Sequence, residues 1–242
     1  SMVHDNQRFV VALRFVEKGE SMATIVAWLL NRLKSIGISI KRAYLDKGFC
    51  SLPVLKTLKR RKIKFILPIP VRGKLGGVRK LFEASGSHQT TYRLTSPKPG
   101  ALEISAVAVK KYSKGRYKRK GARWFAYAVA GLSKSVEPHQ VFEMYRQRFG
   151  IETSYRQMNQ VRARTTSRNP VIRLLLVGLA FILFNLYIAN RQQFAICLKN
   201  PAKPFSKFWL TLRRLARMLA HAVENLYDLA DVVSRHALVA LS

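Results

Sequence analysis

The fold class is decided by residues 38–70, ISIKRAYLDKGFCSLPVLKTLKRRKIKFILPIP. β-branched and aromatic residues predict one strand over residues 38–46 and another over residues 63–70, which ends at Pro68 and Pro70. Between them, LPVLKTLKRRK predicts a short basic helix. Strands separated by a helix do not form a hairpin, so this stretch predicts parallel strands joined by a crossover.

The preceding residues extend the same alternation. RFVVALRFV, residues 8–16, predicts a first strand. Apolar residues at intervals of three and four predict a helix over residues 21–36, with Ser21 as its cap and Gly37 as its end. The β-α-β-α-β order predicts an α/β fold in which helices cover a sheet.

The pattern changes after residue 70. Glycines and prolines separate short alternating segments at about residues 90–95, 102–110 and 123–130, which predicts a β-rich antiparallel insertion. From Pro138 to its end the chain has a helical pattern with a break at KNPAKPFS. We therefore predict four regions: a core part at 3–70, the basic insertion at 71–135, core helices at 136–192 and a helical C-terminal region at 193–242.

The charge points to a polyanionic partner. The 242 residues include 44 Lys or Arg against 12 Asp or Glu, for a formal charge of +32. Such a field favours nucleic acid first and an anionic membrane second. The apolar run at residues 174–189 is 16 residues long, short of the ~20 that cross hydrocarbon, so a buried core helix is favoured over a membrane span. Cys50 and Cys197 predict neither a disulfide framework nor a zinc site, and no signal peptide is visible. A reducing, cytoplasmic compartment fits.

Two acids stand in positions typical of a site. Asp46 ends a predicted strand, and in an α/β sheet ligands bind at the carboxyl ends of strands. Glu152 is the single carboxylate among six arginines in residues 145–170. Near a phosphodiester, carboxylates help by holding cations such as Mg²⁺ or Mn²⁺. The alternatives are that Asp46 caps the next turn, and that Glu152 pairs with Arg148 or Arg156.

Basic and aromatic residues surround both acids. Tyr145, Arg148, Glu152, Arg156 and Asn159 recur at intervals of three or four, which predicts one stripe on a helix. The loop KKYSKGRYKRKGAR has eight Lys or Arg in 14 residues with two tyrosines between them. This composition is typical of a phosphate-contacting loop, although a solvated loop is the alternative.

These residues carry a family resemblance. YLDKGF resembles the Asp-[Arg/Lys]-Gly-Phe element at the second catalytic aspartate of DDE insertion-sequence transposases. YRQRFGIETSYRQMNQ resembles their Tyr-x2-Arg-x3-Glu-x6-Lys signature, with Asn159 in place of the lysine. The resemblance runs from about residue 8 to residue 190. It implies a ribonuclease-H-like fold, two Mg²⁺ ions and hydroxyl attack on phosphodiesters at transposon ends.

The resemblance also implies a third carboxylate, on a central strand upstream of residues 8–16. Asp5 is the only acid ahead of that segment, and we expect an N-terminally truncated transposase whose sheet is incomplete. The Asp46 strand is then expected to have an open edge. We expect little Mg²⁺-dependent nicking by residues 1–242 alone. The alternative function is a non-catalytic DNA-binding remnant that occupies ends or modulates a full-length partner.

The site predicted by pattern and resemblance comprises Asp46 and Glu152 as catalytic metal ligands for Mg²⁺ or Mn²⁺. The predicted DNA contacts are Lys47, Lys118, Arg119, Lys120, Tyr145, Arg148, Arg156, Asn159, Arg162 and Arg164. The predicted partners are double-stranded transposon-end DNA and either a second copy of the chain or a partner chain that supplies missing strands, without a membrane. A prokaryotic, nucleoid-associated location is expected.

Overall fold

The computed structural model describes residues 1–4, 7–73, 76–95, 100–114, 120–133, 135–197 and 211–227. The chain forms two compact units. The first combines residues 1–15 with residues 150–242, and the second is continuous from residue 16 to residue 149.

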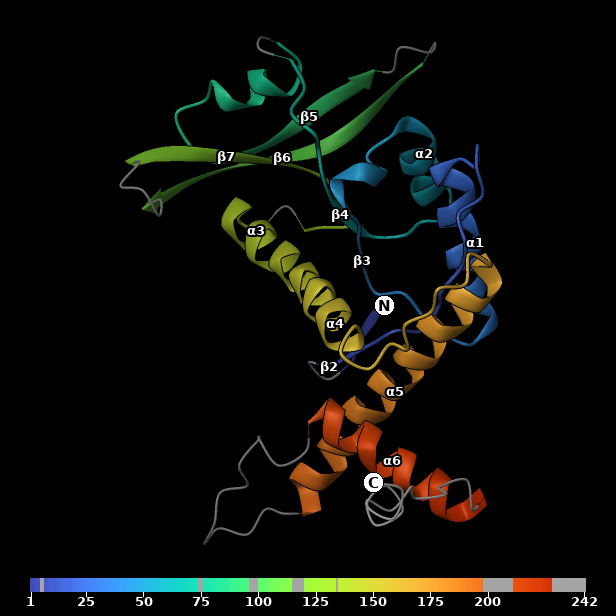
Figure 1. The fold of residues 1–242 in the computed structure, drawn as a ribbon. Coiled ribbons are helices and arrows are strands. Elements are labelled where there is room, and N and C mark those ends of the chain that lie inside the picture. The colour runs from blue at the N-terminus through green and yellow to red at the C-terminus, as the bar shows by residue number, and fades with distance from the viewer. Residues whose placement is uncertain are drawn as a thin grey trace, which may run out of the picture. The chain divides into compact units, whose positions relative to one another are not determined.

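The second unit is built on a five-stranded sheet with the order β3-β4-β7-β6-β5 (Figure 1). Strands β3 (Ala43–Tyr44) and β4 (Phe65–Pro68) pair in parallel, as predicted. The other strands are antiparallel: β5 (His88–Thr95), β6 (Ala101–Lys114) and β7 (Lys120–Ala130). β7 pairs directly with β4, so the strands predicted as an insertion belong to the same mixed sheet as the parallel pair. Among the described residues β3 forms one edge of the sheet, as expected for the strand before Asp46.

Local signals set the two helices of the parallel half. Helix α1 (Met22–Ser35) begins after Ser21, whose hydroxyl accepts a hydrogen bond from the Thr24 amide, and Gly37 follows its end with a φ of +76°. Helix α2 (Leu52–Arg60) lies between β3 and β4, where the sequence predicts it. Both helix predictions are confirmed.

Alternation along β4 gives the sheet two packed faces. Leu67 belongs to the cluster that includes Val54 and Leu58 of α2, whereas its neighbour Ile66 packs with Val141 of α3. Helix α3 (Pro138–Arg146) therefore covers the face opposite to α1 and α2 (Figure 1). It ends in a 3₁₀ turn, η3, at Gln147–Phe149.

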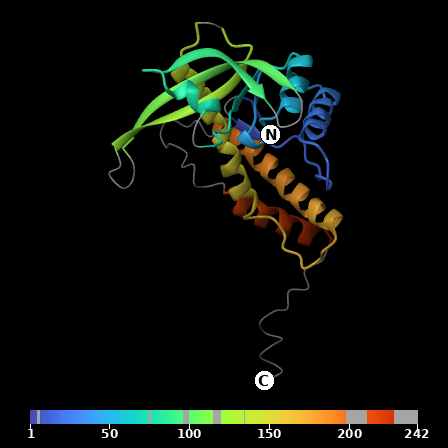
Figure 2. The same cartoon turned by 90° about the horizontal axis from the view of Figure 1, so that it is seen from above.

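The first unit is mainly helical. It contains a short antiparallel hairpin of β1 (Met2–His4) and β2 (Gln7–Phe9), followed later in the chain by α4 (Gly150–Met158), α5 (Pro170–Cys197) and α6 (Leu212–Tyr227). Helices α5 and α6 lie side by side (Figure 2). Phe184 and Tyr187 of α5 pack there against Leu212 and Leu215 of α6.

The strand predicted at residues 8–16 is wrong beyond Phe9. The backbone of Val10 instead forms hydrogen bonds with a side chain. The Val10 amide donates to Asn185 Oδ1 at 2.9 Å, and Asn185 Nδ2 donates to the Val10 carbonyl at 2.8 Å. Asn185 is the one polar residue in the apolar run of α5, so its role is to fix this segment.

The strand predicted at residues 38–46 is also mostly wrong, because only Ala43 and Tyr44 form it. The Ile38 amide bonds to Leu33 O at 2.9 Å, so the start of the segment completes the end of α1.

The helical pattern predicted after Pro138 is interrupted twice within the described residues, and its predicted break at KNPAKPFS lies outside them. The first interruption is η3. The second is the loop at residues 159–169, where three side chains bond to amides two residues ahead: Thr165 to Ser167, Ser167 to Asn169, and Asn169 to Val171. Such local bonds compete with helical ones, so the loop persists until α5 begins at Pro170.

The length argument made for the apolar run is wrong. Helix α5 has 28 residues, and its part Pro170–Arg191 has a mean hydropathy of 2.4 and is 22% buried. By length and composition this part could cross a membrane. One face of α5 carries the buried Ala180, Phe181, Phe184 and Tyr187. Leu175, Leu179, Ile182 and Leu186 are exposed.

Candidate catalytic and DNA-binding residues

Asp46 follows β3 directly and has an extended backbone, with φ −76° and ψ 157°. It occupies the N-cap position of the 3₁₀ turn η1 (Lys47–Phe49), but its side chain makes no capping hydrogen bond there. The capping alternative for Asp46 is therefore wrong. Its side chain is 48% exposed, which leaves the carboxylate accessible at the carboxyl end of a parallel strand.

Two residues from the end of the α3 segment hold the Asp46 region. The Tyr145 hydroxyl donates to the carbonyl of Leu45 at 3.1 Å, across 100 positions of sequence. Arg148, in η3, places one guanidinium nitrogen 3.3 Å from Asp46 Oδ1. The backbone before the acid and the acid itself thus each have a partner from the same short segment.

Both partners are well fixed. Tyr145 is 5% exposed and its ring lies 5.2 Å from that of Tyr127, centroid to centroid. The Arg148 side chain is 16% exposed, and its guanidinium lies 5.7 Å from the Tyr145 ring and 5.5 Å from the Phe149 ring. Aromatic faces stabilise a cation at such distances. Desolvation by burial raises the pKa of Tyr127, which keeps this phenol neutral.

Glu152 lies in the first turn of α4 and is exposed. A carboxylate in the first turn of a helix is favoured by the helix dipole. The neighbouring Gly150 provides the space for the guanidinium of Arg8, since a Cβ on Gly150 would overlap it. The two compact units divide between Phe149 and Gly150, so Asp46 belongs to one and Glu152 to the other. The predicted convergence of the two acids stays a prediction. The predicted single helical stripe from Tyr145 to Asn159 is wrong, because α3 ends at Arg146, η3 follows, and Asn159 lies beyond the end of α4.

The donor chemistry of Asp46 and Glu152 fits Mg²⁺ or Mn²⁺, because both offer exposed carboxylate oxygens to a hard divalent cation. Within the described parts of the chain, no three His, Cys, Asp or Glu residues gather as a group that could hold a metal ion. Asp5 lies outside the described residues.

Exposed basic residues of the first unit gather around the loop after α4. Arg156 lies on α4, whereas Asn159, Arg162 and Arg164 lie in the loop, and all are exposed. Part of this loop and the start of α5 line an open cavity of about 430 Å³. Its lining is Arg162, Ala163, Arg164, Thr165, Arg173, Leu176 and Val177.

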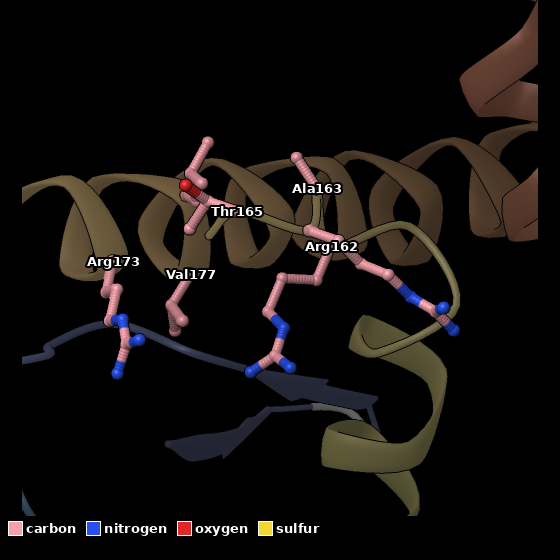
Figure 3. Close-up of a pocket in the computed structure, with 7 residues that line it drawn as sticks. Arg162, Ala163, Thr165, Arg173 and Val177 are labelled. Carbon is pink, nitrogen blue, oxygen red and sulfur yellow. The ribbon is translucent and has the colours of Figure 1, made fainter. Parts of the chain in front are cut away.

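Figure 3 shows the loop running beside α5, with Arg173 and Val177 projecting from the helix to the same side. Arg173 is held by a hydrogen bond from its Nε to Ser167 O at 2.8 Å. In the part of the chain that the structure describes, none of Arg162, Arg164 and Arg173 has an ion pair with a carboxylate. Sequence reasoning missed Arg173. Its position in the first turn of a helix that follows an arginine-rich loop was the available signal.

The predicted contacts of the basic loop between β6 and β7 are only partly described. Lys118 and Arg119 lie outside the described residues, and Lys120 is the first residue of β7. Lys47 is exposed in η1, next to Asp46.

Comparison with known proteins identifies the family. A family model described as "Transposase DDE domain" matches residues 1–186, which include both Asp46 and Glu152. The chain belongs to the DDE transposase family. The DDE transposase family predicted from the sequence is thereby confirmed, and membership supports a function in transposition and implies DNA binding. Members of this family generally use divalent metal ions. No curated protein matches the chain.

Proposed function

We propose that this DDE transposase domain binds transposon-end DNA and takes part in Mg²⁺-dependent phosphodiester cleavage and strand transfer. The observation that carries the proposal is the family match over residues 1–186, because it spans the exposed strand-end aspartate and the helix that carries Glu152. A ribonuclease-H-like core is part of the proposal, supported by the parallel β3–β4 pair with α2 as its crossover.

Asp46 and Glu152 are the proposed metal ligands. A bound divalent ion would polarise the phosphate and activate the attacking hydroxyl. The chain's own contribution is to present two accessible carboxylates. Asp46 fits this role through its exposed side chain at the end of β3. Glu152 fits it through its exposed position at a helix N-terminus.

The proposed DNA contacts are basic residues in each of the two units, together with Asn159. Arg162, Arg164 and Arg173 line one cavity in the first unit, and three cations without described ion pairs favour the phosphates of a nucleic acid backbone. Arg156 and Asn159 precede them on the same segment, and Lys47 flanks Asp46. Lys118, Arg119 and Lys120 complete the proposed contacts on the basic loop. We place the protein in a prokaryotic cytoplasm, on nucleoid DNA, where it acts with a second copy or with a partner chain.

The alternative is a non-catalytic DNA-binding protein that occupies transposon ends. It is favoured by one specific observation, namely that no group of three metal-ligating residues occurs in the described residues. Both functions predict DNA binding. Metal-dependent cleavage is what separates them.

The experiment offers labelled transposon-end duplex to the wild-type chain, Asp46→Asn and Glu152→Gln, with Mg²⁺ or Mn²⁺, and measures binding and nicking in the same samples. If the chain is catalytic, both substitutions abolish nicking while DNA binding changes less than about threefold, because each removes one ligand of the same metal site. Nicking that survives both substitutions refutes the assignment of the two acids. Full DNA occupancy without nicking by the wild-type chain supports the non-catalytic alternative.

A further inference from the structure

We infer that Tyr145 and Arg148 act as a clamp on Asp46: Tyr145 fixes the backbone before the carboxylate, and Arg148 is the counter-ion that a divalent cation must displace or share. Both are thereby positioning residues, a role distinct from the DNA contacts that the sequence predicts for them. The inference rests on the proposed function of Asp46 as a metal ligand.

The geometry supports the Tyr145 part of the clamp. β3 has two residues, so its pairing with β4 gives little support to the chain beyond Tyr44. After it, the Leu45 amide reaches Ile66 O at 3.4 Å, a long bond. The Tyr145 hydroxyl supplies a second restraint at the Leu45 carbonyl, at 3.1 Å. Because the Tyr145 ring is buried and already ordered, its hydroxyl holds the Leu45 carbonyl with little further loss of side-chain entropy.

Arg148 acts on the carboxylate itself. Its guanidinium lies beside the rings of Tyr145 and Phe149 and the side chain is largely buried, whereas Asp46 is half exposed. The rigid partner is thus the cation and the accessible partner is the acid. A divalent ion that approaches Asp46 meets a positive charge 3.3 Å from Oδ1, which opposes its binding.

A direct phosphate contact by Tyr145 is hard to reconcile with this packing. Tyr145 is 5% exposed and its hydroxyl already donates to a backbone carbonyl. Contacts to phosphate require an accessible donor.

The first test measures Mn²⁺ binding by electron paramagnetic resonance in four forms of the full chain: wild type, Arg148→Gln, Arg148→Lys and Arg146→Gln. Arg146 is the matched control, because it lies two positions away, is exposed and pairs with Glu143 at 3.0 Å. Both glutamine variants lower the net charge by one. Removal of a unit charge beside a ligand carboxylate predicts Mn²⁺ affinity raised about tenfold in Arg148→Gln. Arg148→Lys keeps the charge and stays within about threefold of wild type.

Equal Mn²⁺ affinities in Arg148→Gln and Arg146→Gln overturn the counter-ion role, provided that Asp46→Asn weakens the Mn²⁺ site. If Asp46→Asn leaves Mn²⁺ binding unchanged, the proposed metal site at Asp46 fails, and the counter-ion role fails with it.

The second test needs no metal and separates the clamp from the proposed function. Tyr145→Phe keeps the ring and removes the hydroxyl. We expect faster hydrogen exchange at the Leu45 and Phe49 amides, which flank Asp46, and unchanged exchange in the paired centres of β6 and β7. Tyr127→Phe is the control, because it removes a phenol from the same cluster without touching the Leu45 carbonyl. Equal exchange at Leu45 in the two variants overturns the clamp even where the metal site is real.

Discussion

The arginine-lined cavity predicts how DNA affinity depends on salt. The perturbation is the triple substitution of Arg162, Arg164 and Arg173 by glutamine, which removes the three cations of one cavity. If each contacts one phosphate, the slope of log K against log salt concentration becomes shallower by about 2.7, since each contact contributes about 0.9. Between 50 and 200 mM salt the wild type should therefore lose about 40-fold more affinity than the variant.

The assay is fluorescence anisotropy with a labelled duplex of about 20 base pairs at four salt concentrations. The control is a triple substitution that removes the same charge elsewhere. It replaces the exposed Lys34, Lys41 and Lys56 by glutamine. A second control replaces the three arginines by lysine, which retains the charge and should retain most of the slope.

The reasoning would be refuted if the salt slope were equal in two variants: the one in which the three arginines become glutamine, and the one in which Lys34, Lys41 and Lys56 become glutamine. That result would show that the total charge of +32 determines affinity, with no particular contribution from this cavity. Because Arg173 Nε donates to Ser167 O, thermal unfolding of each variant must also be recorded, so that a lost loop conformation is recognised.

Three further predictions concern stability and reactivity. Asn185→Ala should lower the free energy of unfolding by about 2–4 kcal/mol, since two backbone groups lose their partner. The control Asn190→Ala, on the same helix, should lower it by less than about 1 kcal/mol. Equal losses in chemical denaturation would contradict this prediction. Gly131→Ala should lower the free energy of unfolding by about 1–3 kcal/mol more than Gly37→Ala does. Both glycines have positive φ, but of the two only Gly131 would bring an added Cβ against a side chain, that of the facing Lys64. Burial raises the pKa of the Cys50 thiol to about 11, so its thiolate is scarce at neutral pH and alkylation should accelerate only as pH approaches 11; rapid alkylation at pH 8, measured by mass spectrometry of its peptide, contradicts this.

Elements with local signals were predicted well from the sequence. The capped helix after Ser21 and the long strands β5, β6 and β7 occur where predicted, because a cap, a stop glycine and an alternating pattern act within a few residues. The wrong strand at residues 10–16 has a different cause. Its residues have high strand propensity, yet the backbone partner of Val10 is the side chain of Asn185, 175 positions away. The hydrophobic periodicity of a segment cannot indicate a hydrogen-bond partner so far away in the sequence.

The acids of the candidate site were predicted from position and charge, and their role stays a prediction. Asp46 was predicted because it ends a strand of an α/β sheet, where ligands bind. Glu152 was predicted because it is the single carboxylate among six arginines. Arg173 was missed because it lies in an apolar stretch, and only the folded loop brings it beside Arg162 and Arg164.

Charge alone also leaves the role of an arginine open, and Arg148 shows why. In the sequence it is one of six arginines between residues 145 and 170, and all six invite the same interpretation as phosphate contacts. Burial divides them: the Arg148 side chain is 16% exposed and lies against a carboxylate, whereas Arg162 and Arg164 are exposed without a described acidic partner. A buried, paired cation contributes to the position and electrostatics of its acid, and an exposed, unpaired one contributes to binding of a polyanion. Substitution of Arg148 should therefore change divalent-ion affinity more than the salt slope of DNA binding, and substitution of Arg162 should do the reverse.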